Sequence, residues 1–456
     1  MRERGRPEQD GGTGGGGAGL AVLVRADDPG AVSREVARLG VPAAVDELER
    51  LDRGARATAV RALDARTGTA VLAALDPPLQ AELLRALPDP VGAGLALRLD
   101  PDDRARLLDG LPDDVAERLL AGLPEDERRM TVALAGHPPD SAGRRMSPEV
   151  VALPDGWDVG RALDHVRREG AAAETVYMLP VVDDARVVVG VVALRRLVLT
   201  PDEVALREVM SRPVVVRADD DQEVAARTVR DHGLLAAPVV DDGGRLLGVL
   251  TVDDAMRVLE EEVDEDSARG GGSEPLRRPY LATSVPRLVR ARVVWLLVLL
   301  VGAGLTVGVL GAFEATLAQV VTLSLFVPLL IGTGGNAGAQ AVTTVVRALS
   351  VGDVRPSDVG RVVAREAATG LLLGTSLALV GAVPATLVAG PDVALVLCLS
   401  LVVVCTLATT VGSVVPVVAT RVGVDPAVVS SPFITTVVDA TGLVVYFLVA
   451  QAVLGL

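Results

Sequence analysis

The chain has 456 residues, of which 50% are hydrophobic and 23% are charged, and its formal net charge is -15. At about 150 residues per domain, this length favours roughly three domains over one compact core. The acidic balance argues against nucleic acid as a partner, since that partner needs a basic surface. The two cysteines, Cys398 and Cys405, share one apolar run and the three histidines are far apart, which argues against a disulfide framework and a cysteine or histidine metal site.

Charge is distributed unevenly along the chain. Residues 287–456 hold 8 Arg and 7 Asp or Glu, whereas residues 1–286 hold 36 basic and 52 acidic residues. The nearly uncharged part contains apolar runs longer than the ~20 residues that an α-helix needs to cross a bilayer. Because Met1–Asp10 is polar and no cleavable signal peptide is visible, we predict a multi-pass membrane protein whose long N-terminal part stays in the cytoplasm.

The first 140 residues divide into a leader and a helical domain. Residues 1–19 are rich in glycine and are predicted to be disordered. In residues 20–140 a leucine followed by Asp-Pro or by Pro and an acid recurs every 12 residues, from Leu75 to Leu123. Each unit predicts one short helix, capped by the Asp or started by the Pro-acid pair, with paired leucines as its buried stripe. Helices this short must stack, which predicts an α-helical superhelical N domain.

Residues 141–262 contain a duplication of a different period. The segment LPVVDDARVVVGVVALRRL at 179–197 is echoed by APVVDDGGRLLGVLTVDDA at 237–255, with β-branched runs that predict strands and acidic turns between them. These segments resemble a tandem pair of α/β CBS domains. That resemblance implies adenine-nucleotide binding where a Thr or Ser stands three residues before an Asp, as Thr251 and Asp254 do in the second copy. It allows one ATP site and argues against two, and the same pair equally fits a helix cap.

An acidic run follows the duplication. Six of the seven residues from Glu260 to Asp266 are acidic, and a glycine break stands at 270–272. One interpretation is a solvated linker. The other is that residues 263–286 contain a connecting helix whose carboxylates need divalent cations before they can approach another acidic surface.

The membrane part, 287–456, predicts an all-α domain of five spans. They are placed at roughly 290–313, 316–347, 359–389, 392–420 and 427–454. Arginines flank the first span and the predicted inner loops, whereas the predicted outer loops contain none, so the positive-inside rule puts the C-terminus outside.

Two membrane segments carry polar residues that a lipid-facing helix does not need. Residues 328–349 hold a cluster of glycines with Asn336, the only Asn in the chain, and Gln340. Glycines at this density allow close approach of backbones or expose carbonyl groups. Asp439 lies 13 residues after Asp425, about 20 Å along a helix and inside the hydrocarbon. A lone acid at that depth favours a cation pathway over a structural role.

These two segments resemble the MgtE family of magnesium channels and transporters. The matching sequences are GGNAGAQ at 334–340 and SSPFITTVVDATG at 430–442, and the domain order also agrees. The resemblance implies a homodimer in the cell membrane, with an ion pathway on its axis. It also implies an acidic cytoplasmic region that closes the pore when intracellular Mg2+ is abundant.

The resemblance assigns residues to the pore and to the regulatory region. Asp439 is expected to be the pore carboxylate, with the remaining pore residues being Asn336, Thr435, Thr436, Gly442 and, at the cytoplasmic mouth, Asp425. The expected regulatory Mg2+ ligands are Asp102, Asp103, Asp221, Glu223, Asp254, Glu262, Glu265 and Asp266. Gly233 and Arg257 depart from the family pattern, which often has acids there, so a shifted set-point is expected.

The expected function is therefore Mg2+ uptake down the electrochemical gradient, closed by intracellular Mg2+, without enzymatic activity. Two alternatives stay open at this point. One is a CBS-regulated transporter of another divalent cation such as Co2+. The other is a membrane-anchored adenine-nucleotide sensor, which Thr251 and Asp254 motivate.

Overall fold

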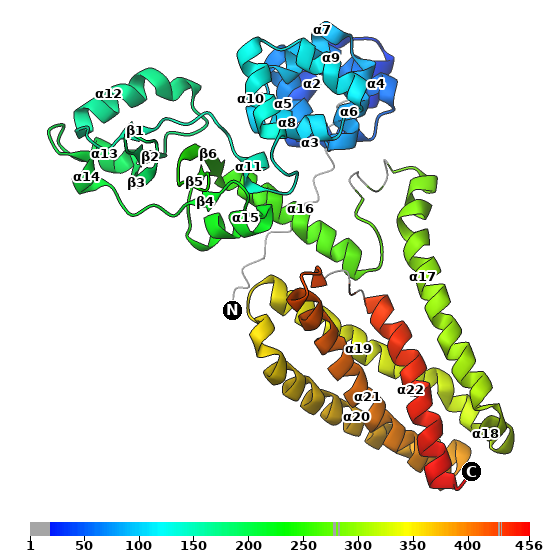
Figure 1. Cartoon of the computed structure of the whole chain (residues 1–456). Coiled ribbons are helices and arrows are strands. Elements are labelled where there is room, and N and C mark those ends of the chain that lie inside the picture. Colours follow the sequence, from blue (N-terminus) through cyan, green and yellow to red (C-terminus); the bar gives the residue numbers. More distant parts are fainter. Residues whose placement is uncertain (1–18, 277–279, 281–282, 427–428, 430) are drawn as a thin grey trace, which may run out of the picture. The chain divides into compact units, whose positions relative to one another are not determined.

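The computed structural model describes residues 19–276, 280, 283–426, 429 and 431–456 (Figure 1). Of the predicted disordered leader, all but Gly19 lies outside these residues. The chain forms two compact units, which meet in sequence between Glu260 and Glu261, and each is described by itself below.

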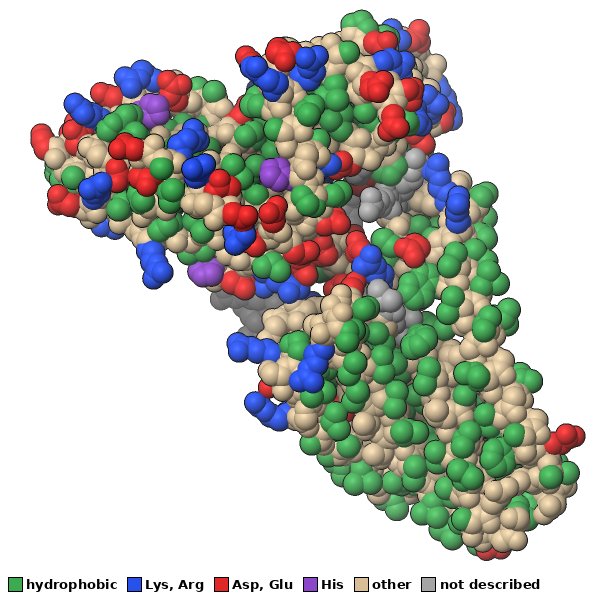
Figure 2. Space-filling view, in the orientation of Figure 1, with side chains coloured by type: hydrophobic (Ala, Val, Ile, Leu, Met, Phe, Trp, Pro, Cys, Tyr) green, Lys and Arg blue, Asp and Glu red, His purple; other side chains and the backbone are tan. Residues whose placement is uncertain are grey.

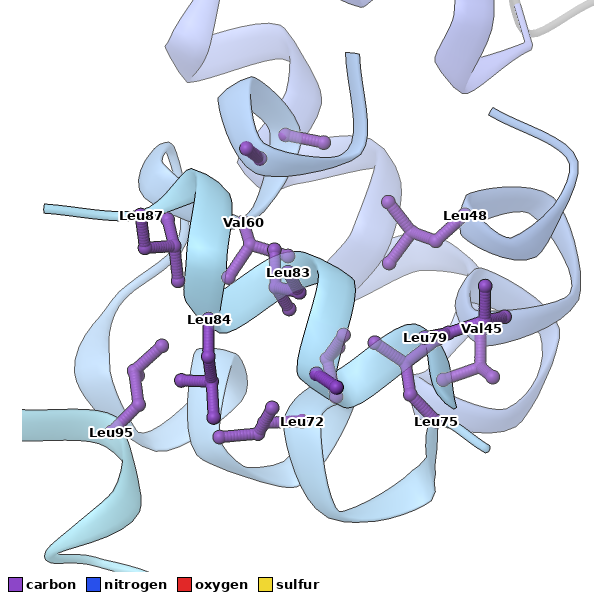
Figure 3. Close-up of a cluster of buried hydrophobic side chains, with 14 of the residues drawn as sticks. Val45, Leu48, Val60, Leu72, Leu75, Leu79, Leu83, Leu84, Leu87 and Leu95 are labelled. Atoms are coloured by element: carbon purple, nitrogen blue, oxygen red, sulfur yellow. The ribbon is translucent and has the colours of Figure 1, made fainter. Parts of the chain in front are cut away.

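The first unit opens with a layered array of short helices. Its core contains leucines from successive helices, among them Leu48, Leu72, Leu79 and Leu83 (Figure 3). The helices are α1 (Leu20–Arg25), α2 (Pro29–Leu39), α3 (Val41–Glu49), α4 (Arg53–Arg61), α5 (Ala65–Ala74), α6 (Pro77–Ala86), α7 (Asp89–Ala96), α8 (Pro101–Asp109), α9 (Asp113–Ala121), α10 (Glu125–Ala135) and α11 (Ala142–Arg145).

The 12-residue repeat predicts this array well. Its five leucines are each no more than 8% exposed and precede α6 to α10, namely Leu75, Leu87, Leu99, Leu111 and Leu123. The predicted capping is wrong in detail, because Asp76 and Asp100 occupy N-cap positions without a side-chain capping hydrogen bond. Proline follows each of them at the first helical position, which it suits because the amide there has no partner within the helix.

Two three-stranded sheets follow, and their matching topology confirms the duplication. In the first, β1 (Leu153–Pro154) runs parallel to β2 (Met178–Val182), which pairs antiparallel with β3 (Val188–Ala193). In the second, β4 (Val216–Arg217), β5 (Ala236–Val240) and β6 (Leu246–Thr251) repeat this order, including a register shift near the end of the central strand.

The predicted acidic turns connect the antiparallel strands of both sheets. Asp183 Oδ1 accepts a hydrogen bond of 2.8 Å from the amide of Val187, and Asp241 Oδ1 accepts one of 2.8 Å from the amide of Arg245. The helices of this region are α12 (Val159–Glu169), α13 (Leu194–Val198), α14 (Leu206–Val209) and α15 (Gln222–Asp231), with a 3-10 turn at Gly170–Ala172. The predicted α/β CBS-like architecture is present in both copies.

The acidic run is helical. Helix α16 (Val252–Gly270) starts directly after β6 and includes all six acids of the run. Its residues up to Glu260 belong to the first unit and those from Glu261 onward to the second. Helix, rather than an irregular linker, is therefore the conformation of this segment.

The second unit contains five helices long and apolar enough to cross a membrane, among the described residues. They are α17 (Val285–Ala312), α19 (Val327–Ser350), α20 (Val359–Ala389), α21 (Pro391–Arg421) and α22 (Ser431–Leu454). Hydrophobic side chains cover much of the visible surface of these helices (Figure 2). The predicted all-α membrane domain of five spans is confirmed as a fold class.

The second predicted span needs a correction. Residues 316–326 do not continue into one helix, since they form most of α18 (Glu314–Gln319) and the 3-10 turn Val321–Phe326. Helix α19 then begins beside Pro328, a residue that suits the first turn of a helix because the amide there has no partner within the helix. A similar 3-10 turn, Pro356–Asp358, precedes α20.

Candidate functional site

Asp439 is the acid in the middle of α22, and its Oδ1 atom is buried. Within the described part of the chain, this oxygen has no hydrogen-bond partner. An ionised carboxylate at membrane depth is unfavourable by several kcal/mol unless it meets water, a partner or an ion. The Asp439 carboxylate therefore needs a cation or water beside it, which makes it a candidate cation site.

Glycines of α19 bring its backbone against α22 at this carboxylate. A Cβ atom at Gly335 would lie 2.7 Å from Thr435 Cγ2 and 3.3 Å from Asp439 Oδ1. A Cβ atom at Gly338 would lie 3.1 Å from Ile434 Cγ2. Distances this short require glycine, so the predicted close approach of backbones is what the glycine cluster provides.

Thr435 and Thr436 both use their hydroxyl protons within α22. Thr435 Oγ1 donates to the Ser431 carbonyl at 2.8 Å, and Thr436 Oγ1 donates to the Pro432 carbonyl at 2.9 Å. Each hydroxyl oxygen keeps acceptor capacity that suits a cation or its water. Of the two, Thr435 lies at Gly335, next to Asp439.

The other predicted pore residues point in different directions. Asn336 is exposed on α19 and follows Gly335 in the sequence. Thr436 faces α17, because a Cβ atom at Gly302 would lie 2.8 Å from its Cγ2 atom. Gly442 is buried against α21, where a Cβ atom would lie 3.3 Å from Val404 Cγ1. The structure thus gathers Asp439, Thr435 and Gly335 at one point of the α19–α22 contact.

Asp425 lies before α22 and is ion-paired. Arg269 Nη1 of α16 donates to its Oδ2 atom at 2.6 Å, and the same guanidinium pairs with Glu265. Asp425, the acid predicted at the cytoplasmic mouth, is therefore already paired with the guanidinium of Arg269.

The acidic helix also contacts α19 within the second unit. Ser350 Oγ lies 3.3 Å from Asp266 Oδ2. Between these helices lies a cavity of about 290 Å³, lined by Val263, Asp266, Ser267, Gly270, Val342, Thr343, Val346, Arg347, Ser350, Val429 and Ser431. Of the predicted regulatory acids on α16, Asp266 lines this cavity, Glu265 pairs with Arg269, and Glu262 is half-buried.

A second group of carboxylates lies in the first unit. Asp102 and Asp103 of α8 and Asp254 of α16 each place an oxygen within 4.8 Å of the other two. Asp102 is only 7% exposed, and its Oδ1 atom has no hydrogen-bond partner among the described residues. Burial, reinforced by the charges of Asp254 and Asp103, raises the pKa of Asp102 well above its usual range. Three carboxylates this close together offer the oxygen ligands that a divalent cation takes.

Asp254 has two further partners. Thr251 Oγ1 donates to its Oδ2 atom at 2.6 Å, and Arg257 Nη1 lies 3.3 Å from its Oδ1 atom. Burial raises the pKa of Asp254 despite these contacts. The Thr251 hydroxyl, proposed from sequence as a ribose ligand, thus donates its proton to Asp254 in this structure.

A third carboxylate group escaped the sequence analysis. Asp100, Glu149 and Glu174 also place oxygens within 4.8 Å of one another. Burial, with the charges of Asp100 and Asp254, raises the pKa of Glu174 to about 7. Burial and the charge of Asp100 raise the pKa of Glu149. The signal was absent because the three acids are far apart in sequence and belong to no shared motif.

Asp221 and Glu223 have local roles in the structure. Asp221 is the N-cap of α15, where its Oδ1 atom accepts the amide hydrogen of Glu223 at 2.9 Å. Glu223 pairs with Arg227 on the same helix. Among the described residues, neither acid joins the two carboxylate groups of the first unit.

Family models match most of the chain, excluding residues 262–326. Residues 327–449 match a model described as a divalent cation transporter, MgtE. Residues 40–140 match the MgtE intracellular N domain, and residues 142–200 and 206–261 match the CBS domain.

Curated relatives and a solved structure agree with these matches. The magnesium transporter MgtE of Thermus thermophilus is 40% identical over 71% of this chain and 72% of its own length. That of Enterococcus faecalis is 33% identical over 68% of this chain and 69% of its own. A crystal structure of the cytosolic domain of the Mg2+ channel MgtE in complex with ATP is 32% identical, with a TM-score of 0.50, and covers 53% of this chain and 98% of that one. The chain belongs to the MgtE family of magnesium transporters.

Proposed function

We propose that this protein carries Mg2+ across the cell membrane into the cytoplasm, down the electrochemical gradient, through a site at Asp439. The observation that carries the proposal is the buried Oδ1 atom of Asp439, which lacks a hydrogen-bond partner among the described residues and lies at the glycine contact between α19 and α22. A carboxylate in this position needs a cation or water beside it.

The sparseness of the site suits Mg2+. This ion loses its water reluctantly and is usually held by one or two carboxylates with several waters retained. Asp439 and the Thr435 hydroxyl offer one charged and one neutral oxygen ligand or water partner. An inward-negative potential of 100 mV favours entry of a divalent ion by about 4.6 kcal/mol, twice the value for a single charge. Transport therefore needs no chemical energy source.

Influx into proteoliposomes tests the proposal. Wild-type protein is expected to pass Mg2+, and Asp439→Ala protein is expected to lose most of this influx. Competition by Co2+ in the same assay distinguishes a magnesium transporter from a transporter of another divalent cation. Wild-type protein that passes no Mg2+ in either orientation would overturn the proposal and favour the nucleotide-sensor alternative.

We further propose that intracellular Mg2+ closes the pathway through the acidic residues of the cytoplasmic region. The supporting observation is the group Asp102, Asp103 and Asp254, in which a buried carboxylate oxygen without a hydrogen-bond partner stands beside two other acids. A bound divalent cation neutralises their repulsion and so favours a compact state. The proposal includes Glu262, Glu265 and Asp266, which lie later on the same helix α16, in the unit that contains the membrane helices.

The test of this closure uses the triple variant Glu262→Ala, Glu265→Ala and Asp266→Ala. Wild-type influx is expected to fall at high Mg2+ on the cytoplasmic face, and influx through the triple variant is expected to stay high. Normal closure of the triple variant would exclude α16 as the sensing element. ATP at the CBS pair is included in the same proposal as a modulator, and is tested by repeating the titration with ATP present.

The proposal includes a homodimer with its N-terminal domains in the cytoplasm and its C-terminus outside. One Asp439 per subunit on a shared axis would give the two carboxylates that a hydrated divalent ion accepts. Cross-linking in native membranes tests the dimer, and accessibility of a cysteine placed at Leu456 tests the orientation of the C-terminus.

A further inference from the structure

Arg257 places a guanidinium inside the acidic group of the first unit. It lies on α16, three residues after Asp254, and its Nη1 atom is 3.3 Å from Asp254 Oδ1. The same nitrogen donates to Asp103 Oδ1 of α8 at 2.9 Å. The contact joins residues 154 positions apart, so it is tertiary rather than local.

The contact ties the helical array to the helix that follows the second sheet. Asp103 belongs to α8 and is largely buried, with its side chain 13% exposed, whereas that of Arg257 is 40% exposed. Arg106, also on α8, donates to Asp103 Oδ1 at 2.7 Å. Asp103 thus accepts hydrogen bonds from two guanidinium groups, of which only Arg257 comes from another element.

Guanidinium groups offset much of the negative charge around this point. The three carboxylates of Asp102, Asp103 and Asp254 face the guanidiniums of Arg106 and Arg257, and Arg144 and Arg145 line the same small cavity. The Oδ1 atom of Asp102 has no hydrogen-bond partner among the described residues. The guanidiniums stay charged at any physiological pH. Helix α8 can therefore lie against α16 before a divalent cation arrives, and an arriving cation meets a smaller negative charge.

We propose that Arg257 is a permanent cation that replaces part of the charge otherwise supplied by a regulatory divalent ion, keeping α8 against α16 when Mg2+ is scarce. It also competes with the ion for Asp103 and Asp254. The contact between the helical array and the second CBS repeat consequently responds less to Mg2+ than three uncompensated carboxylates would. This inference rests on the proposed regulation of the transporter and adds to it a residue that sets how strongly the interface depends on the ion.

Spin-label distances in the full-length protein in nanodiscs test the inference. Labels are attached at Glu117→Cys on α9 and Glu208→Cys on α14, both exposed, in a background with Cys398 and Cys405 replaced by Ser. Distances are recorded in EDTA and in saturating MgCl2. The variants are Arg257→Gln, which removes the charge, and Arg257→Lys, which keeps it. The matched control is Arg245→Gln, an exposed arginine in the turn before β6.

Wild-type protein is expected to show a shift toward shorter distances in MgCl2 that is clearly smaller than the shift in Arg257→Gln. In Arg257→Gln the population of longer distances in EDTA is expected to rise about tenfold, as loss of a charge-assisted hydrogen bond predicts, and MgCl2 is expected to reverse it. Arg257→Lys should largely restore the wild-type distribution, because an ammonium group keeps the charge, and Arg245→Gln should match wild type. A variant that was merely misfolded would not recover in MgCl2.

Two results would overturn the inference. One is an Arg257→Gln distribution in EDTA equal to that of wild type. The other is a wild-type change between EDTA and MgCl2 as large as that of Arg257→Gln. Mg2+ influx of the same preparations separates this failure from failure of the proposed function, because absent influx in wild type rejects transport and leaves the distance result standing.

Discussion

Arg269 Nη1 and Asp425 Oδ2 lie 2.6 Å apart, which joins the end of α16 to the segment that leads into α22. The same guanidinium pairs with Glu265 one turn earlier on α16. Because α22 carries Asp439, this pair links the acidic helix to the helix that holds the proposed pore carboxylate. It is one contact, beside that of Asp266 with Ser350, through which a movement of α16 would reach the helices at the proposed site.

The first prediction concerns this pair. Arg269→Gln is expected to weaken the closed state by about 1 kcal/mol, since the pair is partly exposed and therefore screened. Mg2+ influx at high cytoplasmic Mg2+ should rise severalfold, while influx at low Mg2+ should change little. Asp425→Asn should have the same effect, and the double variant should be no worse than either single one. Arg421→Gln, an exposed arginine four residues before Asp425, is the control, and leaky closure in that variant too would refute the role of the pair.

The second prediction concerns the charge of Asp439. Asp439→Asn keeps the shape of the side chain but removes the charge, so Mg2+ influx is expected to fall at least about tenfold through loss of a charged cation ligand. Asp392→Asn is the matched control, because Asp392 is exposed in the first turn of α21. A Mg2+-sensitive dye inside the proteoliposomes measures the influx. Equal influx through wild type and Asp439→Asn would remove Asp439 from the pathway.

The third prediction concerns the backbone contact at the site. Gly335→Ala inserts a methyl group 2.7 Å from Thr435 Cγ2, which forces α19 and α22 apart. The protein is expected to lose about 1–3 kcal/mol of stability, as overpacking usually costs, together with much of its influx. Gly332→Ala is the control on the same helix, since nothing lies within 4 Å of a Cβ atom there. Thermal unfolding in detergent and dye influx measure the two effects, and similar behaviour of both variants would argue against a tight contact at Gly335.

The fourth prediction concerns pH. Since the pKa of Glu174 is raised from 4.5 to about 7, its protonated form is favoured in the folded state. Its contribution to stability is fully present below about pH 4.5 and is lost as pH rises through 7. In EDTA the free energy of unfolding of the cytoplasmic region should therefore fall by about 1–2 kcal/mol between pH 5.5 and pH 8, after allowing for the half-exposed position of Glu174. Thermal unfolding at the two pH values measures the change.

Two comparisons sharpen the pH experiment. Glu174→Gln should flatten the dependence, because the amide cannot ionise, whereas Glu169→Gln changes an exposed acid nearby and should not. Added Mg2+ should stabilise the protein more at pH 8 than at pH 5.5, since the ion needs ionised carboxylates and protons compete for them. A stabilising effect of Mg2+ that is independent of pH would contradict binding at these acids.

Regularly spaced leucines, long apolar runs and a few polar residues within them made much of this structure predictable. The leucine repeat from Leu75 to Leu123 reports burial directly, and the spans follow from long apolar runs. Asp439 stood out because a lone acid in an apolar helix is unfavourable. The glycines around Gly335 predicted close packing, and the structure shows which side chain each one meets.

Contacts between distant residues were beyond the sequence. Arg269 and Asp425 are 156 residues apart, and no local pattern announces their pairing. The acids Asp100, Glu149 and Glu174 are far apart in sequence and come together only in the folded first unit. The N-cap prediction at Asp76 failed, whereas Asp28, which is also followed by proline, does cap its helix through the Ala31 amide.

The packing of α20 on α21 limits how the membrane unit can move. Cβ atoms at Gly370 and Gly374 would lie 2.7 Å from the Cys405 carbonyl oxygen and 2.6 Å from Val402 Cα, so the two backbones touch over more than one turn. Packed surfaces of this kind do not deform gradually. Helices α20 and α21 should therefore move as one rigid body. Any widening of the proposed pathway must then change the contacts between other helices, which meet through longer and more adaptable side chains.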